Sequence, residues 1–127
     1  MPSILITDDE ESILEYFEDV LSDMGLDVYA ARDGQEALEM LENLQPDLML
    51  VDLMMPKVDG IQLIETIRKA DKKIPVIVVS GTEDDRKKAA AKSKGANVVL
   101  PKPLDLSEFE NTIWQLLDNQ RLIEDHF

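Results

Sequence analysis

Reactive polar residues stand directly after short apolar runs at several places in this chain. The apolar runs cover residues 4–6, 48–51, 76–79 and 98–100, and their composition favours buried strands. The carboxyl ends of parallel strands meet at one edge of a sheet, so residues that follow such strands should converge. The residues concerned are Asp8, Asp9, Asp52, Ser80 and Lys102.

Three carboxylates at one place repel one another. Two unit charges about 4 Å apart cost about 4 kcal/mol at an effective dielectric constant near 20. A hard divalent cation with oxygen ligands removes this cost, and Mg²⁺ keeps coordination positions free for water and phosphate. The residues therefore predict a Mg²⁺-dependent phosphoryl-transfer site, with Mg²⁺ as the cofactor.

Length and composition indicate one ordinary globular domain. The chain has 127 residues, of which 44% are apolar and 31% charged. It has no cysteine, which excludes disulfides and thiolate zinc sites. No apolar run approaches a membrane span, and the N-terminus leads straight into a strand rather than a signal peptide. We expect a cytoplasmic protein that does not bind membranes.

The net charge of −14 is unevenly distributed. Residues 1–50 carry 14 acidic side chains and one basic side chain, Arg32, whereas residues 51–127 are nearly balanced. Phosphates would be repelled, so direct nucleic-acid binding by this domain is not expected. The region near residues 84–94 inverts the sign and is predicted to bind a partner, although a solvated face is an equal alternative. Its basic residues are Arg86, Lys87, Lys88, Lys92 and Lys94.

Strand and helix patterns alternate along the chain, with a further strand at residues 27–30. Helices are expected at 13–24, from 37 to Pro46, from Gly60, from 84 or 85 to Gly95, and at about 106–124. Ser107 and Glu110 have the spacing of a capping box for the last helix, and Trp114 is expected to be a packing residue on that helix. The alternation predicts an α/β fold, a doubly wound five-stranded parallel sheet with helices on both faces.

In this arrangement residues 1–127 form a single domain. The end of the last helix exceeds what a small sheet needs to cover it. We expect this helix to continue as a connector into an output domain beyond this chain, or into a coiled-coil homodimer. His126 is given no role.

Four motifs together resemble the receiver domains of two-component response regulators, over nearly the whole chain. Each motif alone is weak, but their order and spacing are specific. The resemblance implies a flavodoxin-like sheet with strand order 2-1-3-4-5. The motifs are Asp8-Asp9, the run DLMMPKVDG at residues 52–60, Ser80-Gly81 and Lys102-Pro103.

The resemblance implies a role for each acidic residue. Asp52 corresponds to the phosphoacceptor. Asp9, Asp52 and the backbone carbonyl of Met54 correspond to direct Mg²⁺ ligands, and Asp8 corresponds to an acidic residue that acts through water.

The resemblance also implies switch and tuning residues. Lys102 corresponds to the lysine that pairs first with the carboxylate and then with the phosphoryl group, and Ser80 to the hydroxyl that turns toward it. Gly81 leaves room beside the phosphate. Met54 and Thr82 occupy positions that tune hydrolysis of the phosphoaspartate.

Two further features concern the fifth strand and the turn after it. The bond between Lys102 and Pro103 is expected to be cis, which aims the lysine at the acceptor. Many receivers place an aromatic residue three positions before the lysine, but this chain has Val99. We therefore expect intact phosphorylation chemistry with a signal that does not use an aromatic rotation.

The function implied is a phosphorylation-dependent signalling switch. A histidine kinase or phosphotransfer protein would donate to Asp52, and the domain would catalyse only its own phosphotransfer and slow autodephosphorylation. One alternative is a pseudo-receiver that binds partners without phosphorylation, although no residue of the acidic pocket is missing. Another is an aspartate-nucleophile phosphohydrolase, which needs a second aspartate where Met54 stands.

Overall fold

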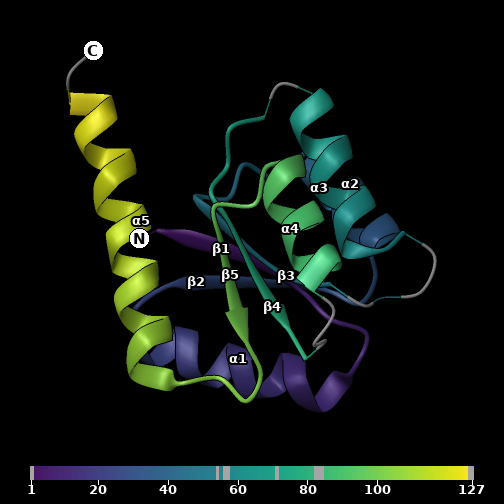
Figure 1. Cartoon of the computed structure of the whole chain (residues 1–127). Helices are drawn as coiled ribbons and strands as arrows, with labels where there is room; N and C mark the ends of the chain where they lie inside the picture. The colour runs from purple at the N-terminus through teal and green to yellow at the C-terminus, as the bar shows by residue number, and fades with distance from the viewer. Residues whose placement is uncertain (1, 54, 56–57, 71, 82–84, 126–127) are drawn as a thin grey trace.

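Strands and helices alternate throughout the computed structural model, which describes residues 2–53, 55, 58–70, 72–81 and 85–125, and side chains as far as residue 119. The elements lie where the apolar runs and helical spacings predict them (Figure 1). In chain order they are β1 Ser3–Thr7, α1 Glu11–Asp23, β2 Asp27–Ala31, α2 Gly34–Leu41, β3 Leu48–Asp52, α3 Gly60–Lys69, β4 Val76–Ser80, α4 Asp85–Lys94, β5 Val98–Pro101 and α5 Leu106–Asp125.

All five strands are parallel, in the order β2-β1-β3-β4-β5. This order confirms the predicted doubly wound fold. In register, Thr7 of β1 lies beside Val51 of β3, and Asp52 lies beside Val79 of β4. The carboxyl ends of the three central strands therefore open at the same edge. Among the described residues, no helix has the length and apolar character needed to cross a membrane.

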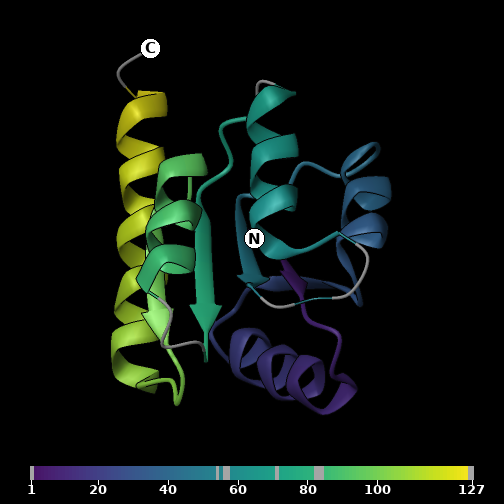
Figure 2. The ribbon, with the colours of Figure 1, turned by 45° about the vertical axis from the view of Figure 1, so that its right-hand side comes forward.

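Helices cover both faces of the sheet (Figure 2). Helices α1 and α5 cover one face, and α2, α3 and α4 cover the other. Successive strand residues point to opposite faces, so Ile4 and Ile6 pack on the α1 and α5 side while Leu5 packs on the other side. Burial on both faces explains why the central strands are apolar without alternation.

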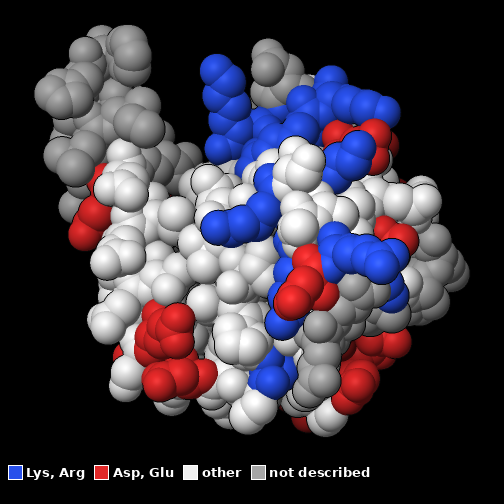
Figure 3. Space-filling view, viewed as in Figure 1, with Lys and Arg blue, Asp and Glu red and all other residues white. Residues whose placement is uncertain are grey.

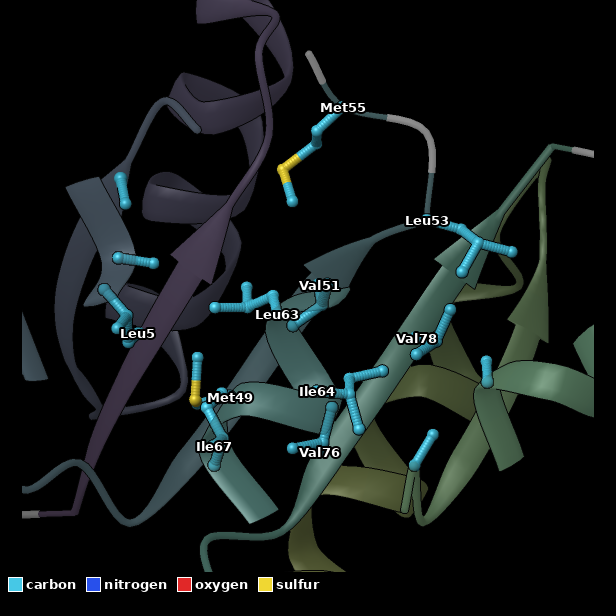
Figure 4. Close-up of a cluster of buried hydrophobic side chains, with 14 of the residues drawn as sticks. Leu5, Met49, Val51, Leu53, Met55, Leu63, Ile64, Ile67, Val76 and Val78 are labelled. Atoms are coloured by element: carbon cyan, nitrogen blue, oxygen red, sulfur yellow. The ribbon is translucent and has the colours of Figure 1, made fainter. Parts of the chain in front are cut away.

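The cluster of buried side chains on the α2–α4 side is shown in Figure 4. Side chains from β1, β3 and β4 meet the inward face of α3 there. Most are fully buried, which gives the sheet edge a rigid base. The central members are Leu5, Met49, Val51, Leu63, Ile64, Ile67, Val76 and Val78.

Helix α2 is shorter than its apolar pattern predicts. It ends at Leu41 rather than running to Pro46, and Leu44 is half-buried in the irregular segment that follows. A proline disfavours the helical conformation of the residue before it, so the chain leaves the helix before Pro46. The prediction of helix up to Pro46 was therefore wrong by about one turn.

The start of α5 also differs from its prediction. Asp105 caps the helix, because its Oδ1 accepts the backbone N–H of Glu108 at 3.1 Å. Ser107 already lies in the first helical turn, so the predicted capping box of Ser107 and Glu110 was wrong. Trp114 is 41% exposed, which corrects the expectation that it is a packing residue. It follows the fully buried Ile113 and is turned by about 100° around the helix from that inward side.

Arg68 ties several elements together at the edge opposite the carboxyl ends of the strands. Its Nη2 donates to the carbonyl of Gly95 at 2.9 Å and to Oδ1 of Asn97 at 3.2 Å, and its Nη1 donates to the carbonyl of Lys72 at 2.8 Å. Gly95 has φ +124°, and a Cβ there would lie 2.8 Å from the Arg68 side chain. The ends of α3 and α4 are thereby held to the start of β5.

Candidate functional site

Three carboxylates meet at the carboxyl edge of the sheet, as the spacing of the sequence predicts. Asp8 follows β1, and Asp52 is the last residue of β3, the neighbouring strand. One carboxylate oxygen from each of Asp8, Asp9 and Asp52 lies within 4.8 Å of the others. Asp8 and Asp52 are buried, whereas Asp9 is exposed. The cluster therefore has a closed floor and an open side.

Lys102 reaches the same cluster from β5. Its Nζ lies 3.8 Å from Oδ1 of Asp52 and 4.0 Å from Oδ2 of Asp8. Its backbone N–H donates to the carbonyl of Ser80 at 3.0 Å, which fixes the start of the turn. The Lys102–Pro103 bond is cis, as predicted. Since β4 lies between β3 and β5, the lysine side chain passes over the end of β4.

Ser80 lies at the end of β4, between Asp52 at the end of β3 and the strand β5 that Lys102 follows. It is 1% exposed and follows Val79, the register partner of Asp52. Gly81 is exposed next to it, and a Cβ at Gly81 would lie 3.7 Å from Cδ of Lys102. This is ordinary van der Waals contact, so a methyl group at Gly81 would fit against the lysine stem. The expectation that Gly81 leaves room beside the phosphate stays a prediction.

The turn after β3 is packed closely under Asp52. Asp59 caps α3, because its Oδ1 accepts the backbone N–H of Gln62, and Oε1 of Gln62 in turn accepts the backbone N–H of Asp59. A Cβ at Gly60 would lie 2.7 Å from the carbonyl oxygen of Asp52, closer than real contacts allow. Gly60 therefore lets α3 begin against the end of β3. Met54 and Thr82, the predicted tuning residues, lie outside the described residues.

Electrostatics at the cluster favour a cation. The pKa of Asp8 is raised to about 6, chiefly by burial and also by the negative charges of Asp52 and Asp9, against the opposing effects of a hydrogen bond and of Lys102. That bond is donated by the backbone N–H of Glu10 to Oδ1 of Asp8 at 3.0 Å. Lys102, the basic side chain that the described residues place beside the cluster, does not by itself balance three carboxylates. The donor set is all oxygen and partly open, which fits the coordination that Mg²⁺ prefers.

Val99 occupies the position three residues before Lys102, where many receivers have an aromatic residue. It is half-buried and packs against the cluster on the α2–α4 side of the sheet. Its side chain therefore contributes to the core below the site.

Two features near the site were missed by the sequence reasoning. Arg32 Nε lies 3.0 Å from Oε2 of Glu11 and links the end of β2 to the start of α1. A hollow of about 290 Å³ separates α1 from the turn after β5. Tyr16, which lines this hollow, is 49% exposed and stands next to the buried Phe17. Two adjacent aromatic residues on one helix are the sequence feature that could have pointed to the hollow. The hollow is lined by Ile13, Tyr16, Phe17, Val79, Lys102, Pro103 and Leu104.

The fold and this site define a doubly wound α/β domain with an acidic pocket at the carboxyl edge of its sheet. The chain belongs to the response regulator receiver domain family, whose model matches residues 4–114. Such domains are signalling domains rather than classical enzymes, and they bind Mg²⁺ at an acidic pocket.

Individual relatives agree with this assignment. The chain is 34% identical over 122 residues to the response regulator MprA of Mycobacterium ulcerans, covering 96% of this chain and 53% of that protein. It is 33% identical over 114 residues to the alkaline phosphatase synthesis transcriptional regulatory protein PhoP of Bacillus subtilis, covering 90% and 48%. The chain thus spans about half the length of the curated relatives it matches.

Solved structures show the same fold. The receiver domain of the Francisella response regulator 1452 superposes with a TM-score of 0.89 at 29% identity, covering 94% of this chain and 99% of that one. A CheY-like receiver domain protein of Methanospirillum hungatei gives a TM-score of 0.90 at 28% identity, covering 95% and 97%.

Proposed function

We propose that this domain accepts a phosphoryl group on Asp52 from a histidine kinase or phosphotransfer protein, in a Mg²⁺-dependent reaction, and that this changes its affinity for a partner. The observation that carries the proposal is the meeting of three carboxylates with Nζ of Lys102, 3.8 Å from Asp52. A carboxylate oxygen of Asp52 would attack phosphorus as the bond to the donor nitrogen breaks, and the electron pair of that bond returns to the imidazole.

Asp9, Asp52 and the carbonyl of Met54 would hold Mg²⁺, and Asp8 would act through a bound water. The ion would supply charge neutralisation for the transferred oxygens, which is the main requirement of phosphoryl transfer. Lys102 would move its ion pair from the carboxylate to a phosphoryl oxygen. The buried hydroxyl of Ser80 is the group placed to respond to the new oxygens.

The test is direct phosphorylation by acetyl phosphate. Incubation with Mg²⁺ should add one phosphoryl group by intact-mass analysis, and chelation of the metal should prevent it. Asp52→Asn should abolish the addition, while Asp59→Asn, which keeps the cap of α3, should leave it unchanged. Labelling of Asp52→Asn at the wild-type level would refute the proposal, and no labelling of the wild type would favour a pseudo-receiver.

We also propose that the polypeptide continues into an output domain after α5. Two observations support this: the relatives named above are about twice as long, and α5 extends to Asp125. The face of α4 and α5 would then contact the output domain or a second copy. Determining the reading frame beyond Phe127 tests this, and a stop codon directly after it would refute the continuation.

A further inference from the structure

A basic surface covers the C-terminal ends of α3 and α4 and the segment after α3. Lys and Arg side chains gather over these two helices in the view of Figure 3. Within the described part of the chain, Glu65 pairs with two of these lysines and lies 3.0 Å from Lys69 and 3.7 Å from Lys94. We call this surface the lysine patch, and its members are Lys69, Lys72, Lys73, Lys92 and Lys94.

The lysine patch is held together rigidly. Arg68 bonds the carbonyl of Lys72 at the end of α3 and the carbonyl of Gly95 at the end of α4. The two groups of lysines therefore keep a fixed separation. A preorganised arrangement of charges loses less conformational freedom on binding than mobile side chains on separate elements would.

The opposite face of the same chain is acidic. Helix α1 lies on the other side of the sheet from α3 and α4 (Figure 2). Its sequence contains no basic residue, and all its acidic side chains are exposed. One of them, Glu11, is paired with Arg32, the one basic residue among the first 50. The acidic residues of α1 are Glu11, Glu15, Glu18, Asp19 and Asp23.

We propose that the lysine patch of one copy of this chain binds the acidic face of α1 on a second copy. The charge complementarity is local, and at about 0.15 M salt the Debye length of about 8 Å screens the repulsion between the rest of the two negative molecules. Because the two faces lie on opposite sides of the sheet, one contact cannot be reciprocal. The association is therefore head-to-tail and can continue beyond a dimer.

The test is the mass of the whole chain in solution, measured by sedimentation velocity over a range of concentrations. At about 0.1 M salt the average mass should rise with concentration above the 14.4 kDa of one chain, and at about 1 M salt, with a Debye length of about 3 Å, it should return to that of one chain. A mass that stays at one chain in both salts, or association that persists at the higher salt, would overturn the proposal.

Two charge-reversal variants locate the contact. The first combines Lys73→Glu with Lys92→Glu in the lysine patch, and the second combines Glu15→Lys with Glu18→Lys on α1. All four side chains are exposed. Each variant alone should lose at least about tenfold in association constant, the equivalent of two to four exposed ion pairs.

Mixing the two variants is the decisive experiment. The acidic side chains introduced into the lysine patch of one variant can then pair with the lysines introduced on α1 of the other. The mixture should associate like the wild type. A variant that still self-associates alone, or a mixture that stays monomeric, would contradict the assigned contact.

A matched control carries the same change of net charge as the α1 variant, but on α5 instead of on α1 or in the lysine patch. Glu108→Lys with Asp118→Lys, both exposed on α5, should associate like the wild type. A loss of association in this control would show that net charge rather than the acidic face of α1 is responsible, and would overturn the proposal. A wild-type chain that stays monomeric and binds duplex DNA through its lysine patch would also overturn the proposal.

Discussion

Replacing Asp8 by asparagine should stabilise the metal-free domain at neutral pH. Asp8 is 4% exposed, and its pKa is raised from 3.8 to about 6, first by burial and then by the charge of Asp52. Asparagine is nearly isosteric and keeps an oxygen that can accept the backbone N–H of Glu10. The substitution therefore removes the buried charge without opening a cavity.

The size of the effect follows from linkage. A difference of about two pKa units corresponds to about 3 kcal/mol. Below about pH 4 both folded and unfolded chains carry the proton, so the Asp8 carboxyl costs nothing. As pH rises from about 4 to about 6 the unfolded chain releases its proton first, and stability is lost. Above about pH 6 the full cost is present. Loss of the 4.0 Å contact with Lys102 offsets part of the gain, so about 2 kcal/mol is expected.

Urea denaturation in the presence of a chelator measures this. At pH 7.5 the midpoint of Asp8→Asn should lie about 1 M above that of the wild type, since m-values for small domains are about 1–3 kcal/mol/M. At pH 4 the two midpoints should coincide. Mg²⁺ should raise the wild-type midpoint more than that of the variant.

Asp19→Asn is the matched control, because it removes one exposed acidic charge from the same negative chain. Its free energy of unfolding should differ from that of the wild type by no more than about 0.5 kcal/mol. An Asp8→Asn variant no more stable than the wild type at pH 7.5, or equally stabilised at pH 4, would refute the reasoning.

Other substitutions test the packing around the site. Gly60→Ala should lower thermal stability by more than about 2 kcal/mol, because its Cβ would lie 2.7 Å from the Asp52 carbonyl, whereas Gly81→Ala should stay within about 1 kcal/mol; equal melting temperatures for the two variants would contradict this. Arg68→Met should cost about 2–4 kcal/mol in urea denaturation, because it leaves carbonyls at the ends of α3 and α4 without their donor; an unchanged midpoint would show that the tie is energetically neutral. In the phosphorylated domain, amide chemical shifts should change around Ser80, and a spectrum unchanged there would count against a signal that passes through this hydroxyl.

The sequence predicted those parts of the fold that depend on burial. Runs such as residues 48–51 and 76–79 are apolar because both faces of their strands are covered, and β1, β3, β4 and β5 were placed correctly from such runs. The meeting of Asp8, Asp9 and Asp52 follows from strand order and could be anticipated. Lys102 could be assigned to the site because it directly follows the fifth strand.

What could not be predicted depends on local geometry. Nothing in the pair Asp8-Asp9 says that the first is buried and the second exposed, because this is decided by the direction in which the chain leaves β1. Asp105 and Ser107 are both good capping residues, and the length of the turn after Pro103 selects the first. Trp114 was expected to be a packing residue, whereas its position next to the inward-facing Ile113 turns it toward the exposed side of the helix.

The Arg68 tie also determines how α4 can respond to events at the acidic pocket. The C-terminal end of α4 is anchored to α3 and to the start of β5, while its N-terminal end lies near Gly81 at the opposite edge of the sheet. A displacement of the N-terminal end would therefore rotate the helix about Gly95 instead of translating it along its axis. Over 10 residues, or about 15 Å, a small tilt becomes a displacement that is largest beside the pocket and vanishes at the lysines nearest the pivot.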